Sequence, residues 1–366
     1  MLKQIKKLTV RIATILNVLV IVAMLSLGLT DHIHPQTYPV LSTFGLGFPL
    51  LLGANVVFLV FWLLVHWKGV WLPIAGLVIG YLPIRTYTPF NFPQSPPADA
   101  IKVLSYNVYQ YDIDGIGEDG KSPIIEYIKE SKADIVCLQE SPIHHQKVKK
   151  AIASLDSLYQ YCDTTCKKEN GSDCLTVYSR FPILSKEYVK YSSKANMTMA
   201  YVLDINGEQV LLVNNHFESN RLTSDDKDSF SHIVKGNASK REAKRESKQL
   251  LQKLGKAAKI RAPQAESVAR YVKKRLDQGM SVIVCGDFND HPLSYAHRIV
   301  SAHLTDCFIA SGNGPGYTYH KNNIYVRIDH ILCSDDWEPY AAKVDTKVTN
   351  SDHYPIYCWL KKRPKP

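Results

Sequence analysis

The sequence predicts a mixed α/β or α+β domain that is preceded by about three transmembrane helices. Three observations lead to this fold class. The first 100 residues of the 366-residue chain contain only eight formally charged side chains. The remaining residues alternate short β-type runs with helical patterns, which is typical of α/β and α+β domains. Apolar runs in this second part also end repeatedly in Asp, Asn, Glu or His, as expected where strand ends converge on a site.

Three uncharged apolar segments predict the membrane helices. They cover residues 12–30, 38–67 and 69–84. A helix needs about 20 apolar residues to span the hydrocarbon core of a bilayer. We therefore expect helices near 9–30, 40–65 and 68–85. The third segment is marginal in length, so two spans with a third, interfacial helix is one alternative. A cleaved signal peptide is the alternative for the first segment.

The distribution of Lys and Arg predicts the orientation of these helices. Four basic residues (Lys3, Lys6, Lys7 and Arg11) precede the first helix, and the loop 31–36 after it has none. Because Lys and Arg are enriched in cytoplasmic loops, we expect the N-terminus inside. With three spans, the residues after 86 then lie outside the cytoplasm, which means the periplasm or the cell surface in a bacterium.

Composition divides the chain into four parts. A charge-poor membrane anchor comes first. It is followed by a proline-rich segment, which we interpret as a semi-rigid linker. The main domain and a short basic tail complete the chain. The predicted ranges are 1–87 for the anchor, 88–100 for the linker, 101–361 for the domain and 362–366 for the tail.

We expect eight strands and four helices in the main domain. The strands are predicted at 101–108, 135–138, 175–178, 201–205, 210–214, 282–285, 328–333 and 354–360. The helices are predicted at 123–131, 240–254, 264–278 and 294–302.

Polar residues follow or interrupt six of the apolar runs. A single residue of this kind is more often a turn or cap residue than a catalytic one. Six in one domain predict a shared site. These residues are Asn107, Glu140, His216, Asp287 with Asn289, Asp329, and Asp352 with His353.

The motifs that contain these residues resemble the endonuclease/exonuclease/phosphatase superfamily, which includes DNase I-like nucleases. The stretches SYNV, LQE, SRFPI, VNNHFES, CGDFND, RIDHIL and SDHYPI occur in the order found in that family. The resemblance covers 101–361. It implies a four-layer sandwich of two mixed β-sheets flanked by helices. It also implies Mg²⁺- or Mn²⁺-dependent cleavage of a phosphate ester.

The residue types suit metal-assisted chemistry at a negatively charged phosphoryl centre. Glu140 is a hard oxygen ligand of the kind that Mg²⁺ prefers. Asn107 is expected to assist that metal or to orient a phosphate oxygen, and Asp352 to add a metal contact. By resemblance, His353 is the general base or electrostatic partner of the attacking water, and Asp329 orients His353.

The remaining site residues are assigned by the same resemblance. Asp287 and Asn289 are expected to position the nucleophile and to hold phosphate oxygens. His216 is expected to donate a hydrogen bond to the phosphate or to the leaving oxygen. His330 is interpreted as structural, and His291 as a surface or loop residue. Arg261 and Gln264 precede the CGDFND strand in a helix, where we expect them to pack or brace.

The net charge of +10 is concentrated in one stretch. Apolar content of 45% and charged content of 21% exclude a disordered or fibrous protein. Residues 235–275 hold fourteen Lys or Arg and three Glu. This stretch is either a patch for a polyanion or for anionic headgroups, or a solvated helical face with internal ion pairs.

The cysteines bear on the compartment. Cys162, Cys166 and Cys174 lie within thirteen residues in a polar, hairpin-like region. A disulfide is expected there if the domain lies outside the cytoplasm, and we predict the pair Cys162–Cys174.

Three functions are consistent with the sequence. The first is a membrane-anchored phosphoesterase that acts outside the cytoplasm on a lipid-linked or headgroup phosphate. Its architecture resembles the teicoplanin-resistance membrane proteins. The second is a membrane-tethered nuclease acting on DNA or RNA. The third is a non-catalytic binding protein, which the intact set of site residues argues against. The expected partners are the bilayer and an anionic substrate, and nothing indicates a protein partner.

Overall fold

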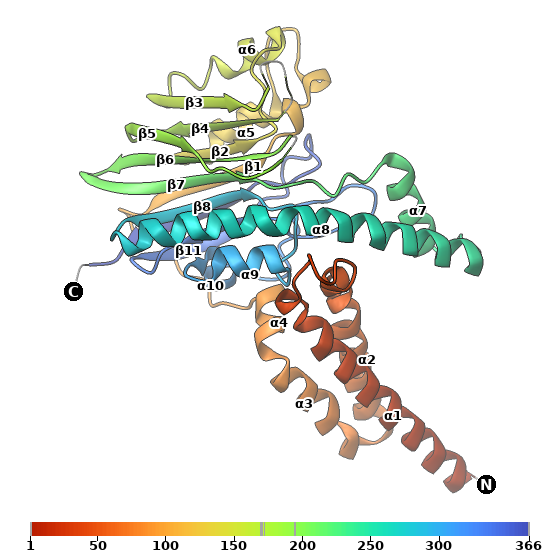
Figure 1. The fold of residues 1–366 in the computed structure, drawn as a ribbon. Coiled ribbons are helices and arrows are strands. Elements are labelled where there is room, and N and C mark those ends of the chain that lie inside the picture. The colour runs from red at the N-terminus through yellow and green to blue at the C-terminus, as the bar shows by residue number, and fades with distance from the viewer. Residues whose placement is uncertain (1, 169–170, 172, 194, 365–366) are drawn as a thin grey trace.

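Two six-stranded β-sheets packed face to face form the main domain (Figure 1). The computed structural model describes residues 2–168, 171, 173–193 and 195–364. The first sheet has the order β11 (Trp337–Val344), β12 (Ile356–Lys362), β1 (Ile101–Asn107), β2 (Ile135–Gln139), β4 (Cys174–Ser179), β3 (Tyr161–Cys166). The second has the order β5 (Ile183–Tyr188), β6 (Met197–Ile205), β7 (Glu208–His216), β8 (Ser281–Asp287), β10 (Asp329–Cys333), β9 (Thr305–Asp306).

Helices cover the outer face of each sheet. The first sheet packs against α5 (Pro123–Ser131) and α6 (Gln146–Ile152), and the second against α8 (Lys240–Asp277) and α9 (Tyr295–Ser301). Two further helices, α7 (Ser224–Val234) and α10 (Cys307–Ser311), precede α8 and follow β9. The 3-10 helices η4 (Tyr109–Tyr111) and η5 (Ile113–Gly115) follow β1. The predicted four-layer sandwich is therefore confirmed.

Alternation along the strands builds the layers. Successive side chains of a strand point to opposite faces of its sheet. In β8, Ile283 and Cys285 enter the core between the two sheets, whereas Val282 and Val284 enter the core beneath α8 and α9. Both faces of the central strands are buried, which explains why they occur as continuous apolar runs in the sequence.

Helix α8 is continuous, although two separate helices were expected at 240–254 and 264–278. Pro263 lies inside it. A proline within a helix leaves the carbonyl four residues earlier without its N–H partner. Here that carbonyl belongs to Lys259, and it accepts a hydrogen bond from Gln36 Nε2 at 2.8 Å. Burial of Ala262 and Ala265, on either side of Pro263, also holds the two halves in one helix.

The anchor contains the helices α1 (Leu2–Gly28), α2 (Phe48–Val65), α3 (Trp71–Ile79) and α4 (Tyr81–Tyr87), with the 3-10 helices η1 (Thr30–His32), η2 (Leu41–Gly47) and η3 (Trp67–Gly69). Two helical segments, Gln4–His32 and Leu41–Val65, are long and apolar enough to cross a membrane. The third predicted segment forms two helices bent by 66°, so the number of candidate spans is two, or three if the bent pair counts as one.

Buried amides join the anchor helices. Asn17 Nδ2 donates to Asn55 Oδ1 at 3.1 Å, and Trp62 Nε1 donates to Asn17 Oδ1 at 2.9 Å. Asn55 Nδ2 in turn donates to the carbonyl of Pro73. These hydrogen bonds link α1, α2 and α3 through buried polar side chains.

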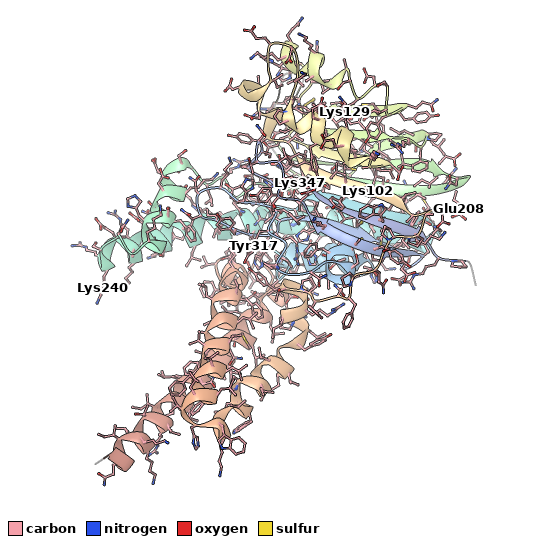
Figure 2. The ribbon with its side chains drawn as sticks, turned by 180° about the vertical axis from the view of Figure 1, so that it is seen from behind. Lys102, Lys129, Glu208, Lys240, Tyr317 and Lys347 are labelled. Carbon is pink, nitrogen blue, oxygen red and sulfur yellow. A yellow bond between two sulfur atoms is a disulfide. The ribbon has the colours of Figure 1, made fainter. Side chains whose placement is uncertain are left out.

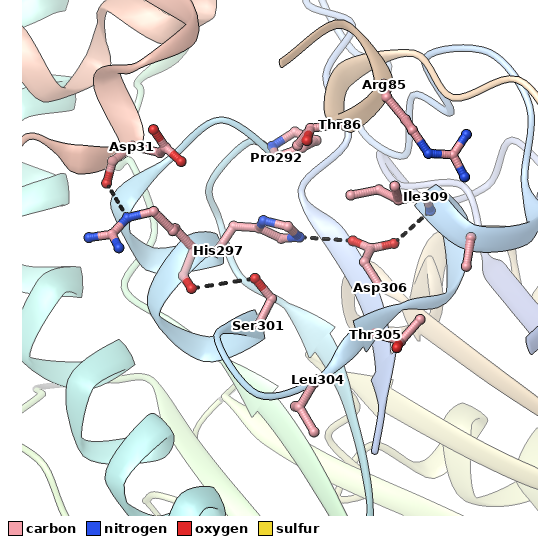
Figure 3. Close-up of a pocket in the computed structure, with 12 residues that line it drawn as sticks. Asp31, Arg85, Thr86, Pro292, His297, Ser301, Leu304, Thr305, Asp306 and Ile309 are labelled. Carbon is pink, nitrogen blue, oxygen red and sulfur yellow. Dashed lines mark hydrogen bonds and ion pairs between the residues drawn. The ribbon is translucent and has the colours of Figure 1, made fainter. Parts of the chain in front are cut away.

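The anchor is packed firmly against the domain. Met24, Phe48 and Tyr87 form an apolar cluster with Leu293. The buried guanidinium of Arg327 donates to the carbonyls of Thr86 and Tyr87 at the end of α4. A cavity of about 340 Å³ lies at this junction (Figure 3).

The linker and the tail are also attached to the domain. In the linker, Asn91 Nδ2 donates to the carbonyls of Ile309 and Gly312. At the other end, Lys362 is the last residue of β12 and pairs with Asp336. The strand thus extends one residue past the predicted boundary at 361. The last two residues of the predicted tail lie outside the described part of the chain.

The predicted disulfide pair is wrong. The bond joins Cys166 to Cys174 and leaves Cys162 as a free thiol. The antiparallel register of β3 and β4 explains the difference, because it places Cys166 opposite Cys174 and Cys162 opposite Tyr178. The spacing of the cysteines along the sequence does not reveal this register.

His291 is buried at the junction rather than exposed. A Cβ atom on Gly45 of the anchor would lie 2.5 Å from His291 Cε1. Neither ring nitrogen has a hydrogen-bond partner within the described residues, and burial lowers the pKa of His291 to about 4. The unfolded chain therefore binds a proton at His291 as pH falls below about 6.5, whereas the folded chain does so only near 4.

This burial predicts that the protein loses stability in acid. Because the pKa is lower in the folded state, the stabilisation is present above about pH 6.5 and is lost toward pH 4. The loss from His291 amounts to about 3 kcal/mol. Thermal unfolding in detergent across this range measures it. His291→Gln, which stays neutral, should flatten the pH dependence, and an unchanged slope in that variant would contradict the assignment.

Candidate active site

The predicted site residues close one end of the core between the two sheets. In β1, Val103 lies in this core, and Asn107 lies four residues later on the same face. In β10, Ile331 and Cys333 lie in the core, and Asp329 shares their face. The β8 core residues Ile283 and Cys285 are likewise followed by Asp287. Alternation therefore directs polar side chains from both sheets toward one place.

Strand pairing sets the relative positions of these residues. His216 of β7 is directly opposite Asp287 in the parallel β7–β8 pair, and Asp329 of β10 is opposite Asp287 in the antiparallel β8–β10 pair. Asn107 is opposite Gln139 in the parallel β1–β2 pair, so Glu140 follows at the same edge. Pairing thus brings the ends of β7, β8 and β10 together in one sheet and the ends of β1 and β2 together in the other.

Asn107 links the two sheets at the site. Its Nδ2 donates to Glu140 Oε1 at 3.2 Å and to Asp287 Oδ2 at 3.1 Å. Its Oδ1 accepts a hydrogen bond from the backbone N–H of Tyr109. The amide nitrogen rather than the amide oxygen therefore faces the carboxylates.

His353 is held between two carboxylates. Its Nδ1 lies 2.8 Å from Asp329 Oδ2, and its Nε2 lies 3.8 Å from Asp287 Oδ2. Burial alone would lower the pKa of His353, but the charges of Asp329 and Asp287 outweigh it and raise the pKa to about 10. This arrangement favours a protonated imidazole at neutral pH.

Glu140 and Asp287 differ in their access to solvent. The Glu140 side chain is 26% exposed and that of Asp287 is 1% exposed. Burial raises the pKa of both, and for Asp287 the nearby charge of Asp329 raises it further. His216 Nε2 lies 3.8 Å from each of these carboxylates. It has no hydrogen-bond partner within the described residues.

Asn289 and Asp352 occupy more peripheral positions. The backbone N–H of Asn289 donates to Asp287 Oδ1 at 2.7 Å, and its Nδ2 donates to the carbonyl of Phe217 at 3.0 Å. Asn289 therefore supports Asp287 and the loop after His216. Asp352 is half-buried beside His353, and its charge contributes to the raised pKa of Glu140 after burial. The structure thus brings all eight predicted residues to one region, with Asn289 and Asp352 at its margin.

Two site residues have left-handed backbones. Glu140 has φ 50° directly after β2, and Asn289 has φ 52° shortly after β8. Few non-glycine residues adopt this conformation, and it is concentrated at functional sites. It turns the chain sharply at the end of each strand.

Gly286, in the CGDFND motif, is required by close backbone packing. Its φ is +130°, and a Cβ atom there would lie 2.0 Å from the carbonyl oxygen of Asn215 in β7. Gly286→Ala is expected to destabilise the protein by about 3 kcal/mol or more, since both strain and a backbone clash must be relieved. Thermal unfolding measures the loss. Gly207→Ala is the matched control, because Gly207 also has positive φ but open space around it. Equal losses in the two variants would contradict the clash.

The sequence analysis missed four residues that position or surround the site. Ser351 Oγ donates to the carbonyl of Asn107 and accepts the N–H of His353. Thr318 Oγ1 accepts the N–H of Asp329. The Tyr319 ring lies edge-on to His353 with 5.3 Å between ring centroids, and Lys227 Nζ lies 5.4 Å from the Tyr319 ring. Of these four residues, only Ser351 could have been found from the sequence, since it is the first residue of the SDHYPI motif.

The neighbouring residues that were interpreted as structural do lie away from the site. His330 points to the opposite face of β10 from Asp329, where its Nε2 contacts the carbonyl of Asp290. With His297 and Asp306 it forms a second group of close metal-type ligands, but Asp306 also caps α10 through the N–H of Ile309. Arg261 braces the loop after β7 through the carbonyl of Glu218.

The donor set at Glu140 fits a divalent cation. Mg²⁺ takes oxygen ligands, keeps several waters and needs only one or two carboxylates. Glu140 is partly exposed, and Asp329 Oδ1 is buried without a hydrogen-bond partner within the described residues. Asp287, Asp329 and His353 also bring ligand atoms within 4.8 Å of one another.

Comparison with known families agrees with this fold and site. The model of the endonuclease/exonuclease/phosphatase family matches residues 104–353, and the chain belongs to this family. Its members are phosphodiesterases, nucleases and phosphatases and generally depend on a divalent metal, which supports a hydrolase. A second model, described as a domain of unknown function (DUF8431), matches residues 10–87 in the anchor.

Solved structures share the fold. Truncated TDP2 from Caenorhabditis elegans aligns at 17% identity over 73% of this chain and 99% of that chain, with a TM-score of 0.50. The human Nocturnin catalytic domain with bound sulfate anion aligns at 17% identity over 73% and 96%, with a TM-score of 0.51. A functionally unknown conserved protein from Enterococcus faecalis V583 aligns at 15% identity over 72% and 100%, with a TM-score of 0.50. No curated protein matches the sequence.

Proposed function

We propose that this protein is a membrane-anchored, Mg²⁺- or Mn²⁺-dependent phosphoesterase that hydrolyses a lipid-linked or headgroup phosphate outside the cytoplasm. The observation that carries the chemistry is the meeting of Asn107, Glu140, Asp287 and the His353–Asp329 pair at one end of the inter-sheet core. The observation that favours a lipid substrate is the packing of the apolar anchor directly against this domain.

The residues of the site divide the work of phosphate hydrolysis. Glu140 would hold the metal ion, which supplies positive charge to the phosphoryl oxygens when bound. Asp329 accepts a hydrogen bond from His353 Nδ1 and thereby aims Nε2 into the site. A protonated His353 can donate to a phosphate oxygen, so the raised pKa favours the electrostatic role over that of a general base.

The other polar groups hold and orient the reacting groups. Asp287 lies within reach of His216, His353 and Asn107, so it is placed to accept a hydrogen bond from the attacking water. Asn107 offers its amide nitrogen to anionic oxygens. His216 Nε2 has no hydrogen-bond partner among the described residues, so it can donate to the phosphate or to the leaving oxygen.

A substrate panel tests the proposal. The full chain in detergent micelles should release phosphate or headgroup from lipid phosphates with Mg²⁺ and not with EDTA, and His353→Ala should abolish the release. Activity that survives EDTA or His353→Ala would refute the mechanism. Nicking of plasmid DNA or cleavage of RNA without action on lipids would instead support a membrane-tethered nuclease, which the basic stretch 235–275 favours.

The location is tested separately. A reporter fused after Pro366 should be active outside the cytoplasm. A fusion that is active only in the cytosol would overturn the extracytoplasmic placement and leave the chemistry unaffected.

A further inference from the structure

The N-terminal part of α8 extends beyond the sheets toward the side of the anchor. In Figure 1 this part of the helix runs past the strand ends with α7 beside it, above α1 and α2. We call residues 224–255, which comprise α7 and this part of α8, the arm. Lys240 at its tip is far from the sheets in Figure 2.

Helix α8 contacts the loop that joins the two candidate spans. A Cβ atom on Gly255 would lie 2.9 Å from the backbone of Pro39. Glu266 Oε1 lies 3.0 Å from His34 Nε2, and the carbonyl of Lys259 accepts from Gln36 Nε2. The spans end at His32 and begin again at Leu41, so this loop lies at a membrane surface when the spans are inserted.

The face of α8 that contacts this loop continues along the arm as a row of cations. Residues 7, 11 and 14 positions apart share one face of a helix. Counting back from Gly255 gives Lys248, Lys244 and Arg241, which are all exposed. None of these three has an acidic partner anywhere in the described ranges, whereas the arm's ion pairs are Lys253–Asp226 and Arg245–Glu246. We call Arg241, Lys244 and Lys248 the basic face.

Acidic residues gather on a different side of the arm. Glu242 and Glu246 of α8 line one cavity together with Asp225 and Asp228 of α7. A merely solvated helix would intersperse the two signs along one face through pairs three or four residues apart. Here the signs are segregated, and the positive side is the one directed to the membrane-level loop.

We infer that the basic face binds anionic phospholipid headgroups of the same bilayer that holds α1 and α2. The inference rests on the membrane anchoring in the proposed function. Each Lys or Arg held at an anionic membrane surface contributes attraction that fades within about 10 Å at moderate salt. Lys248, the nearest of the three to Gly255, is about 10 Å from it along the helix, and Lys244 and Arg241 follow on the same face.

Lipid contact at the basic face also bears on the site. The arm includes Lys227, whose Nζ lies over the Tyr319 ring, and that ring packs against His353. Lys253 of α8 pairs with Asp226 of α7, so headgroup binding by α8 would steady the helix that carries Lys227. It would do so beside the lipid surface from which a lipid-phosphate substrate would come.

Hydrogen exchange of the full chain in lipid nanodiscs tests the inference. Amides of residues 240–252 should exchange about tenfold more slowly in nanodiscs of phosphatidylcholine with phosphatidylglycerol than in phosphatidylcholine alone. High salt should remove the difference. The triple variant Arg241→Glu/Lys244→Glu/Lys248→Glu should show the same exchange in both lipids.

A matched control keeps the result interpretable. Lys147→Glu/Lys149→Glu/Lys150→Glu makes the same charge change on α6, at the far end of the domain in Figure 1, and should keep the lipid dependence. Two results would overturn the inference: loss of the lipid dependence in this control variant, or equal exchange in both lipids for the parent protein. So would protection of 240–252 by a DNA oligonucleotide without protection by phosphatidylglycerol. Failure of a folded chain to enter nanodiscs would overturn the anchoring itself, and the substrate panel in detergent would still report on the chemistry of the site.

Discussion

Replacing His353 by glutamine should lower kcat by about 10³-fold, with a much smaller change in KM. His353 is fixed by a 2.8 Å contact with Asp329 and aims its other nitrogen toward Asp287. A positioned imidazole contributes about 10²–10⁴-fold to a rate. Glutamine keeps a hydrogen-bonding group of similar reach but cannot carry the positive charge that the two carboxylates stabilise. The measurement is steady-state kinetics on the best substrate of the panel, with Mg²⁺.

Two further variants separate chemistry from structure. Asp329→Asn should also lower kcat, and should shift the alkaline limb of its pH profile, because the raised pKa of His353 depends on the charge of Asp329. The sign is definite: without that charge the pKa of His353 falls, so the protonated form is lost at lower pH. His320→Gln is the control, since His320 stacks on Tyr354 outside the catalytic cluster. An equal fall in kcat for His320→Gln, or none for His353→Gln, would contradict the assignment.

The central strands were predictable because both their faces are buried. All eight predicted strands occur, with ends shifted by a few residues. The four that were missed, β3, β5, β9 and β11, are the four edge strands of the two sheets. An edge strand has fewer buried neighbours, so its sequence need not be apolar. In β5, only the two terminal residues are even half-buried.

The grouping of the polar residues was predictable because the alternation of side chains along the core strands produces it. In a strand whose alternate residues enter the core, the next residue of that series, at the strand end, points to the same face of the sheet. A polar residue at that position is conspicuous in the sequence because it follows an apolar run. Contacts made through loops left no comparable signal. Tyr319 and Lys227 come from an irregular segment and a polar helix, and their proximity to His353 depends on tertiary packing.

Predictions from local sequence failed where contacts with distant parts of the fold decided the structure. Pro263 would ordinarily end a helix, but Gln36 from the anchor satisfies the carbonyl that the proline leaves free. The Cys166–Cys174 bond follows from strand register. His291 is buried because the anchor packs over it through Gly45. Gln36 and Gly45 lie far in sequence from the residues that they contact, and the register that pairs Cys166 with Cys174 is set within the sheet.

Replacing Glu140 by glutamine should remove the response of the protein to divalent metal. Glu140 is the one carboxylate among Glu140, Asp287 and the Asp329–His353 pair with substantial solvent access, so a hydrated ion can reach it. Burial raises its pKa, and a bound cation would favour the ionised carboxylate. Loss of a supporting group at a metal site costs about 10–100-fold in metal affinity, so loss of this ligand should cost about 100-fold or more.

Metal-dependent stability provides a readout that does not need a substrate. Mg²⁺ or Mn²⁺ at about 100 times its Kd should stabilise the parent protein by about 2.7 kcal/mol, and Glu140→Gln should abolish this shift in Tm at the same concentration. Affinity should also weaken as pH falls, because protons compete for Glu140. Glu126→Gln is the control, since Glu126 pairs with Lys129 on α5 away from the site. If Glu140→Gln keeps the full metal-induced shift in Tm, the ion is held elsewhere. The cluster of Asp287, Asp329 and His353 would then be the next set of ligands to vary.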